Sequence, residues 1–293
     1  MKNVFFLLFA TALFYGCEFN KSIKKDLMTG LTTQGDGISA EDVFITVNDK
    51  KISRTTFVYG EEMVINFSNV EGLQRENGKA FPGIRFVVIS QSGDTAMATD
   101  DLYTQYDTEG ITISPLRLTT SLVVANPVKS NEEYTIHIKI WDKKSKGTYT
   151  AKLNFKVETN KNITIEKNKA EYTDVYLFAK ETKSIVIDEI YQKETVYMMF
   201  EGLSGFTEIK GMVFPGLGIK GIDKSGSTIV DVPDLFSMYT ETGVNTTDFK
   251  EQVSARFNFE DMQLTPPVKI EVVVWDKKGD AKVKAVVELK IIK

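Results

Sequence analysis

The stretch IHIKIWDKK at residues 136–144 returns as IEVVVWDKK at residues 270–278. In both copies apolar residues alternate with other residues and then end in Trp-Asp-Lys-Lys, a pattern typical of a half-buried strand that leads into a turn. Further back, residues 67–110 align without a gap on residues 200–243. The chain therefore contains an internal duplication, and the residues retained in both copies are those that a common framework requires.

Alternation of period two recurs throughout both copies and predicts half-buried strands. The clearest matched sets are Met63/Ile65/Phe67 with Val196/Met198/Phe200, Ile136/Ile138/Ile140 with Ile270/Val272/Val274, and Leu153/Phe155/Val157 with Val287/Leu289/Ile291. Glycine, aspartate and lysine clusters separate the runs and predict tight hairpins at 142–147 and 276–279. Many short strands with close turns favour an all-β fold of two tandem immunoglobulin-like antiparallel β-sandwich domains, at residues 40–158 and 170–293.

One segment in each copy departs from this alternation. Residues 100–106 correspond to residues 233–239, and an aspartate and a glycine bracket each of them (Asp101 and Gly110, Asp234 and Gly243). Aspartate before an apolar run and glycine after it suit a short helix with a cap at each end. We therefore expect a short helical turn in each domain, over one end of the sandwich.

The amino-terminal residues carry an export signal. Residues 4–15 are almost wholly apolar but shorter than the ~20 residues that span a bilayer, which fits a secretory signal peptide at 1–16. The segment ends at Gly16-Cys17, and Cys17 is the only cysteine. This arrangement resembles a bacterial lipoprotein signal, which implies cleavage before Cys17 and acylation of its thiol. The alternative is an exported protein whose cysteine is incidental. Residues 17–39 lack a strong periodicity and are expected to form a flexible lipidated tether, in which Ile23, Leu27 and Leu31 suggest at most a short helix.

Composition excludes several classes of function. The net charge is −4, and the lysines are interspersed with acidic residues, so no basic patch for nucleic acid is expected. His137 is the only histidine and pairs with Glu271 in the repeat, so zinc ligation and a Cys–His pair are not expected. No catalytic motif is present. We expect no catalytic residues and no cofactor.

The duplicated tryptophans, Trp141 and Trp275, are the candidate ligand platform. If the isoleucines and valines of their strands face the core, both rings lie at a strand end on the opposite, polar face. An exposed indole could stack on a sugar ring. Alternatively, a loop covers each ring and forms a second small core, which is the outcome we expect because tryptophan is highly buried on average.

Four duplicated aspartates are candidate calcium ligands, because carboxylates at one end of a sandwich can hold a hard cation. They are Asp101, Asp142, Asp234 and Asp276. One aspartate at each place supplies too few oxygens, and a helix cap for Asp101 and Asp234 and a turn for Asp142 and Asp276 explain them without metal. No metal is therefore expected.

With its lone cysteine and paired domains, the chain resembles Bacteroidota outer-envelope lipoproteins with tandem immunoglobulin-like domains. That resemblance implies a non-enzymatic binding or interaction protein that is held at the bacterial outer membrane by acylated Cys17 and contacts envelope proteins. The alternative implied by the resemblance is a glycan-binding accessory protein of an outer-membrane uptake system. A hydrolase comes third and is disfavoured.

Overall fold

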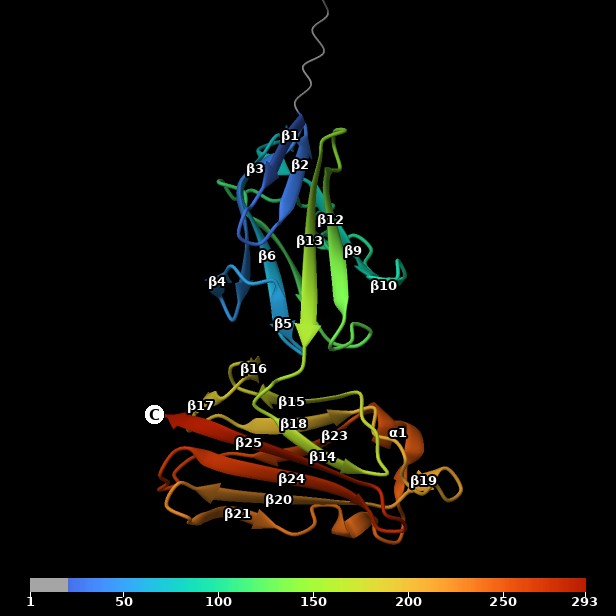
Figure 1. The fold of residues 1–293 in the computed structure, drawn as a ribbon. Coiled ribbons are helices and arrows are strands. Elements are labelled where there is room, and N and C mark those ends of the chain that lie inside the picture. The colour runs from blue at the N-terminus through green and yellow to red at the C-terminus, as the bar shows by residue number, and fades with distance from the viewer. Residues whose placement is uncertain (1–20) are drawn as a thin grey trace, which may run out of the picture.

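The computed structural model describes residues 21–293, which form two β-sandwich modules joined end to end (Figure 1). The first module comprises residues 21–158 and the second residues 164–292, and no sheet combines strands from both. In Figure 1 the strands of the first module run up the picture, whereas those of the second run across it. The all-β fold predicted from the alternation is confirmed.

The first module packs a seven-stranded sheet on a four-stranded sheet. The larger sheet has the order β1-β2-β13-β12-β9-β10, with β5 paired in parallel to β13, and the smaller has the order β11-β6-β3-β4. The strands are β1 Lys21–Lys25, β2 Thr32–Asp36, β3 Ser39–Val47, β4 Lys50–Ile52, β5 Thr56–Val58, β6 Glu62–Glu71, β9 Pro82–Ser90, β10 Thr95–Ala98, β11 Leu118–Val123, β12 Glu133–Asp142 and β13 Thr148–Glu158. A small ribbon joins β7 Arg75–Glu76 to β8 Lys79–Ala80.

The second module repeats this arrangement. Its larger sheet has the order β14-β25-β24-β20-β21, with β17 parallel to β25, and its smaller sheet has the order β16-β15-β18-β23. The strands are β14 Thr164–Asn168, β15 Asp174–Ala179, β16 Ser184–Val186, β17 Glu189–Tyr191, β18 Val196–Glu201, β20 Pro215–Asp223, β21 Thr228–Val232, β23 Val253–Phe257, β24 Val268–Asp276 and β25 Lys282–Ile292, with a ribbon of β19 Met212–Val213 and β22 Val244–Asn245.

Each module has its own apolar core between its two sheets. The alternating residues face inward as predicted: Met63, Ile65, Val196, Met198 and Phe200 are fully buried. Burial of such side chains from both sheets supplies the main driving force for a sandwich of this size.

The expected tether is wrong for residues 21–39. Residues 21–36 form a hairpin of β1 and β2, and β2 pairs with β13 in the larger sheet. In the second module β14 pairs with β25 in the same way, so the connection before residue 170 is also partly a strand. The prediction failed because the inward positions of β2 hold Thr33 and Gly35 instead of large apolar residues. A strand held by backbone hydrogen bonds to its neighbour needs no apolar pattern of its own.

Both predicted helical turns are present, as 3₁₀ turns at Thr104–Tyr106 and Ser237–Tyr239. Gly110 and Gly243 follow them with positive φ angles of 63° and 69°, which a residue with a side chain rarely adopts. The second module adds α1 Thr246–Glu251, which the sequence interpretation missed; Asn245 caps it by accepting a hydrogen bond from the backbone N–H of Thr247 at 2.8 Å. Among residues 21–293, no helix is long and apolar enough to cross a membrane.

Polar side chains join the two modules. The Tyr59 hydroxyl of the first module donates to Oε2 of Glu201 in the second at 2.6 Å, and the Tyr176 hydroxyl donates to Oε1 at 2.7 Å. The Tyr59 hydroxyl also accepts from the Asn126 backbone N–H at 2.9 Å. Burial raises the pKa of both tyrosines, and the Glu201 carboxylate raises them further. The bond from Tyr59 to Glu201 crosses between the modules and constrains their relative orientation.

Candidate functional site

Each tryptophan lies over a glycine of the neighbouring strand. Trp141 on β12 is the register partner of Gly83 on β9, and Trp275 on β24 is the partner of Gly216 on β20. A Cβ atom added at either glycine would overlap the indole. Both rings are half-buried, with the glycine backbone beneath them. Glycine is therefore retained in both copies because only a residue without a side chain lets the ring approach the sheet this closely.

Asp101 and Asp234 attach the segment before each 3₁₀ turn to the sheet. In the first module, Oδ1 of Asp101 accepts from the backbone N–H groups of Ile84 at 3.0 Å and Tyr103 at 2.9 Å. Its Oδ2 lies 2.5 Å from the Lys143 ammonium. Partial burial opposes ionisation of Asp101, but Lys143 and the two N–H donors outweigh it and lower its pKa.

The second module repeats this arrangement at Asp234. Its Oδ1 accepts from the backbone N–H groups of Leu217 at 3.1 Å and Phe236 at 2.8 Å, and its Oδ2 lies 2.7 Å from the Lys277 ammonium. The expected caps are wrong in detail, because residues Tyr103 and Phe236 occupy the cap positions and neither makes a side-chain cap hydrogen bond. The sequence interpretation assigned no role to the two lysines.

Asp142 and Asp276 stabilise the hairpin after the tryptophan, as a turn role predicts. Oδ1 of Asp142 accepts from the Lys144 backbone N–H at 3.0 Å, and its Oδ2 accepts from Gln74 N at 2.7 Å and Ser145 Oγ at 2.6 Å. Asp276 accepts in the same way from the backbone N–H groups of Lys278 and Thr207. Both residues are buried. Through the bonds from Gln74 and Thr207, each carboxylate connects its hairpin to a loop that is distant in the sequence.

The four candidate calcium ligands are thus held by donors of their own module. Asp101 and Asp142 lie in the first module and Asp234 and Asp276 in the second; backbone N–H groups donate to all four carboxylates, and lysines pair with Asp101 and Asp234. Within residues 21–293, no group of three or more histidine, cysteine, aspartate or glutamate residues is placed to hold a metal ion. His137 is exposed on β12.

The surroundings of the two tryptophans differ. Beside Trp141, the cross-strand pair Arg85 and Lys139 places two long cationic side chains on the outer face of the sheet. The equivalent pair beside Trp275 is Gly218 and Val273, which occupy much less space. The duplication has therefore diverged at this position, and the second module has more room beside its indole.

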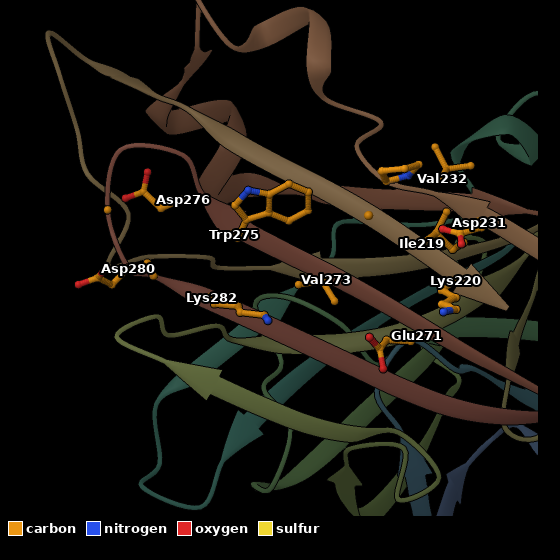
Figure 2. Close-up of a pocket in the computed structure, with 14 residues that line it drawn as sticks. Ile219, Lys220, Asp231, Val232, Glu271, Val273, Trp275, Asp276, Asp280 and Lys282 are labelled. Atoms are coloured by element: carbon orange, nitrogen blue, oxygen red, sulfur yellow. The ribbon is translucent and has the colours of Figure 1, made fainter. Parts of the chain in front are cut away.

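A hollow of about 530 Å³ lies in this space beside Trp275. Figure 2 shows the indole at one side and the side chains of Lys220, Asp231, Glu271 and Lys282 around it. Glu271 lies 3.4 Å from the ammonium of Lys284. An aromatic face with charged groups around it could bind a polar ligand that also has an apolar surface. The sequence predicted a tryptophan ring at the end of one strand in each module. It did not predict that the space beside the two rings differs.

A buried carboxyl lies at the junction of the modules. Asp174 on β15 is 1% exposed, and neither of its oxygens has a hydrogen-bond partner of acceptable geometry in the described chain. Burial raises its pKa to about 6; Glu201, its cross-strand partner, adds to the rise, while the hydroxyl and backbone N–H of Ser130 in the first module partly oppose it. Sequence reasoning missed this group, because an aspartate at a strand end usually lies in solvent.

Comparison with known proteins identifies no family. No family model and no curated protein matches the chain. Three solved structures with about 10% identity are pT26-6p (TM-score 0.25, covering 92% of this chain and 65% of that one), a bacterial ice-binding adhesin (0.22, 86% and 65%) and the fibronectin(III)-like modules of Clostridium thermocellum CbhA (0.20, 84% and 93%). The chain thus spans less than two thirds of the first two. At these scores, the fold assignment rests on the strand topology described above.

Proposed function

We propose that this chain is a non-enzymatic binding or interaction protein of the bacterial cell envelope, held at the outer membrane by acylation of Cys17. Cys17 lies outside the described residues, and its assignment rests on the apolar segment and Gly16 before it. The observation that carries the non-enzymatic part is the use of the duplicated polar residues. Asp101, Lys143 and Asp142, with their second-module equivalents, all hold hairpins and turns in place.

The anchor has a direct test. Replacing Cys17 with alanine is expected to abolish incorporation of a labelled fatty acid and to move the protein from the membrane fraction to the soluble fraction. Acyl chains provide the membrane affinity, and no cysteine remains elsewhere to accept one. A matched Ser22→Ala variant should stay labelled and sedimenting. Unchanged labelling of the Cys17→Ala protein would contradict the lipoprotein assignment.

Glycan binding at Trp275 is the second candidate, and the hollow beside that ring favours it. A sugar ring presents C–H groups that can stack on an indole and hydroxyls that can bond to Lys220, Asp231 or Glu271. Beside Trp141 the equivalent positions carry the long side chains of Arg85 and Lys139. We therefore expect any glycan to bind to the second module and not to the first.

Paired substitutions test this candidate. With a panel of cello-, malto- and xylo-oligosaccharides, Trp275→Ala is expected to weaken binding of any sugar that the full chain binds by roughly 5- to 150-fold, a cost of ~1–3 kcal/mol for a contact aromatic. Trp141→Ala is the control and should leave affinity unchanged. Titration calorimetry measures both. The glycan-binding candidate is contradicted if the two variants lose affinity equally, or if the full chain binds no sugar in the panel. The interaction role would then be the remaining proposal.

A further inference from the structure

The β1–β2 hairpin presents large apolar side chains to solvent, two of them in its turn and one on β1. Leu27 is 92% exposed, Met28 77% and Ile23 70%, and the first two are the most exposed large apolar residues in the described chain. Tight turns ordinarily carry glycine, asparagine or aspartate at such positions. A cluster of this kind marks a contact with a lipid surface or another molecule.

The turn is firmly built rather than loose. Oδ1 of Asp26 accepts from the backbone N–H groups of Met28 at 3.0 Å and Thr29 at 2.7 Å, and also from the Thr29 hydroxyl at 2.8 Å. The Asp26 N–H donates to the carbonyl of Leu31 at 2.8 Å, and Leu31 is buried in the core. The framework of the turn therefore holds the side chains of Leu27 and Met28 outward.

The duplicated fold does not require this hairpin. β2 has an equivalent in β14, because each is the strand that pairs with the last strand of its module. In the described chain nothing pairs with the outer side of β14, whereas β1 pairs with β2 in the first module. β1 and its apolar turn are thus an addition to one copy; β1 begins at Lys21, the first described residue, and the turn lies at the other end of that strand (Figure 1).

The charge of the β1–β2 hairpin and the short length of chain between Cys17 and β1 indicate what the hairpin contacts. Lys25 is exposed beside the apolar residues, the Lys24 ammonium donates to the Ala40 carbonyl at 3.3 Å, and Asp26, the acid of this segment, is engaged by the turn. Apolar tips flanked by lysines suit the interface of a bilayer that contains anionic lipid. The four peptide steps from Cys17 to Lys21 span at most about 14 Å, so acyl chains on Cys17 would keep β1 close to the membrane surface.

We propose that the β1–β2 hairpin lies along the bilayer and inserts Leu27 and Met28 at the boundary between headgroups and acyl chains. This proposal rests on the anchor at Cys17 proposed above. β1 is an edge strand, so no strand of the described fold pairs with its outer side. The contact would hold the first module on its side against the surface and so fix the direction in which the second module projects.

A single introduced thiol tests the contact, because acylation consumes the thiol of Cys17. Met28→Cys is labelled with bimane in the acylated full chain, in vesicles of phosphatidylethanolamine and phosphatidylglycerol. Met238→Cys, at a methionine 74% exposed in the second module, is the matched control. We expect brominated lipids to quench the label at residue 28 at least several-fold more than the label at 238, and aqueous iodide to quench it correspondingly less. Adding Leu27→Ser should reduce the lipid quenching.

The outcomes separate this proposal from the anchor. If neither labelled protein sediments with vesicles, the anchor itself fails. If both sediment and both labels are equally open to iodide, the anchor stands and the docking proposal is overturned. Protection of residue 28 without vesicles, together with a dimer on size-exclusion chromatography, would also overturn it, since the hairpin would then contact a second copy.

Discussion

Replacing Asp276 with alanine is expected to lower the free energy of unfolding of the second module by about 2–4 kcal/mol. The residue is 5% exposed, and its carboxylate accepts hydrogen bonds from the backbone N–H groups of Thr207 at 2.7 Å and Lys278 at 2.9 Å. Alanine leaves two N–H groups without acceptors and a small void, and bonds to a charged acceptor contribute ~1.5–3 kcal/mol each. Asp142→Ala should have a similar effect on the first module.

The chain provides its own reporters and controls for this measurement. Each module contains one tryptophan, so urea unfolding followed by fluorescence reports on both. Asp280→Ala is the matched control: Asp280 lies in the same hairpin, is exposed, and makes a surface ion pair with Lys169, so its loss should change stability by at most ~0.5–1 kcal/mol. An Asp276→Ala effect no larger than that of Asp280→Ala would contradict the structural role assigned to Asp276.

Replacing Asp174 with asparagine is expected to stabilise the protein by about 1–3 kcal/mol above pH 7. Asp174 is buried without a well-formed hydrogen bond, and its folded pKa of about 6 lies above the ordinary aspartate pKa of 3.8, which applies in the unfolded state. Between these two values the folded state binds a proton that the unfolded state does not. Stability from this group is therefore fully present below the unfolded pKa and is lost as pH rises through about 6.

The pH profile distinguishes this account from a simple packing effect. Asparagine does not titrate, so the difference between the Asp174→Asn protein and the natural protein should shrink as pH falls from 8 toward 4. Denaturant unfolding at a series of pH values measures that difference. Asp42→Asn is the control, because Asp42 occupies the equivalent strand position in the first module but is exposed and paired with Lys51. A difference for Asp174→Asn that is constant with pH would refute the assigned pKa.

The sequence alone determined the strands that carry the cores. Inward positions such as Met63 and Ile136 alternate with polar ones, and period-two burial follows directly from strand geometry. Duplication revealed the hairpins and the 3₁₀ turns, because their glycines and aspartates recur at matching places. Conversely, β1, β2 and β14 escaped prediction, since a strand held by its neighbour's backbone shows little pattern of its own.

The candidate sites depended on the tertiary structure, because each one combines residues that are distant along the chain. Register places Gly83 under Trp141 and Gly216 under Trp275, and the pair Gly218 and Val273 leaves a hollow beside Trp275 where the first module has Arg85 and Lys139. Asp42 and Asp174 occupy equivalent positions, yet one is in solvent and the other is buried at the junction. Sequence periodicity specifies which face of a strand a residue occupies, whereas packing between strands and modules decides what covers that face.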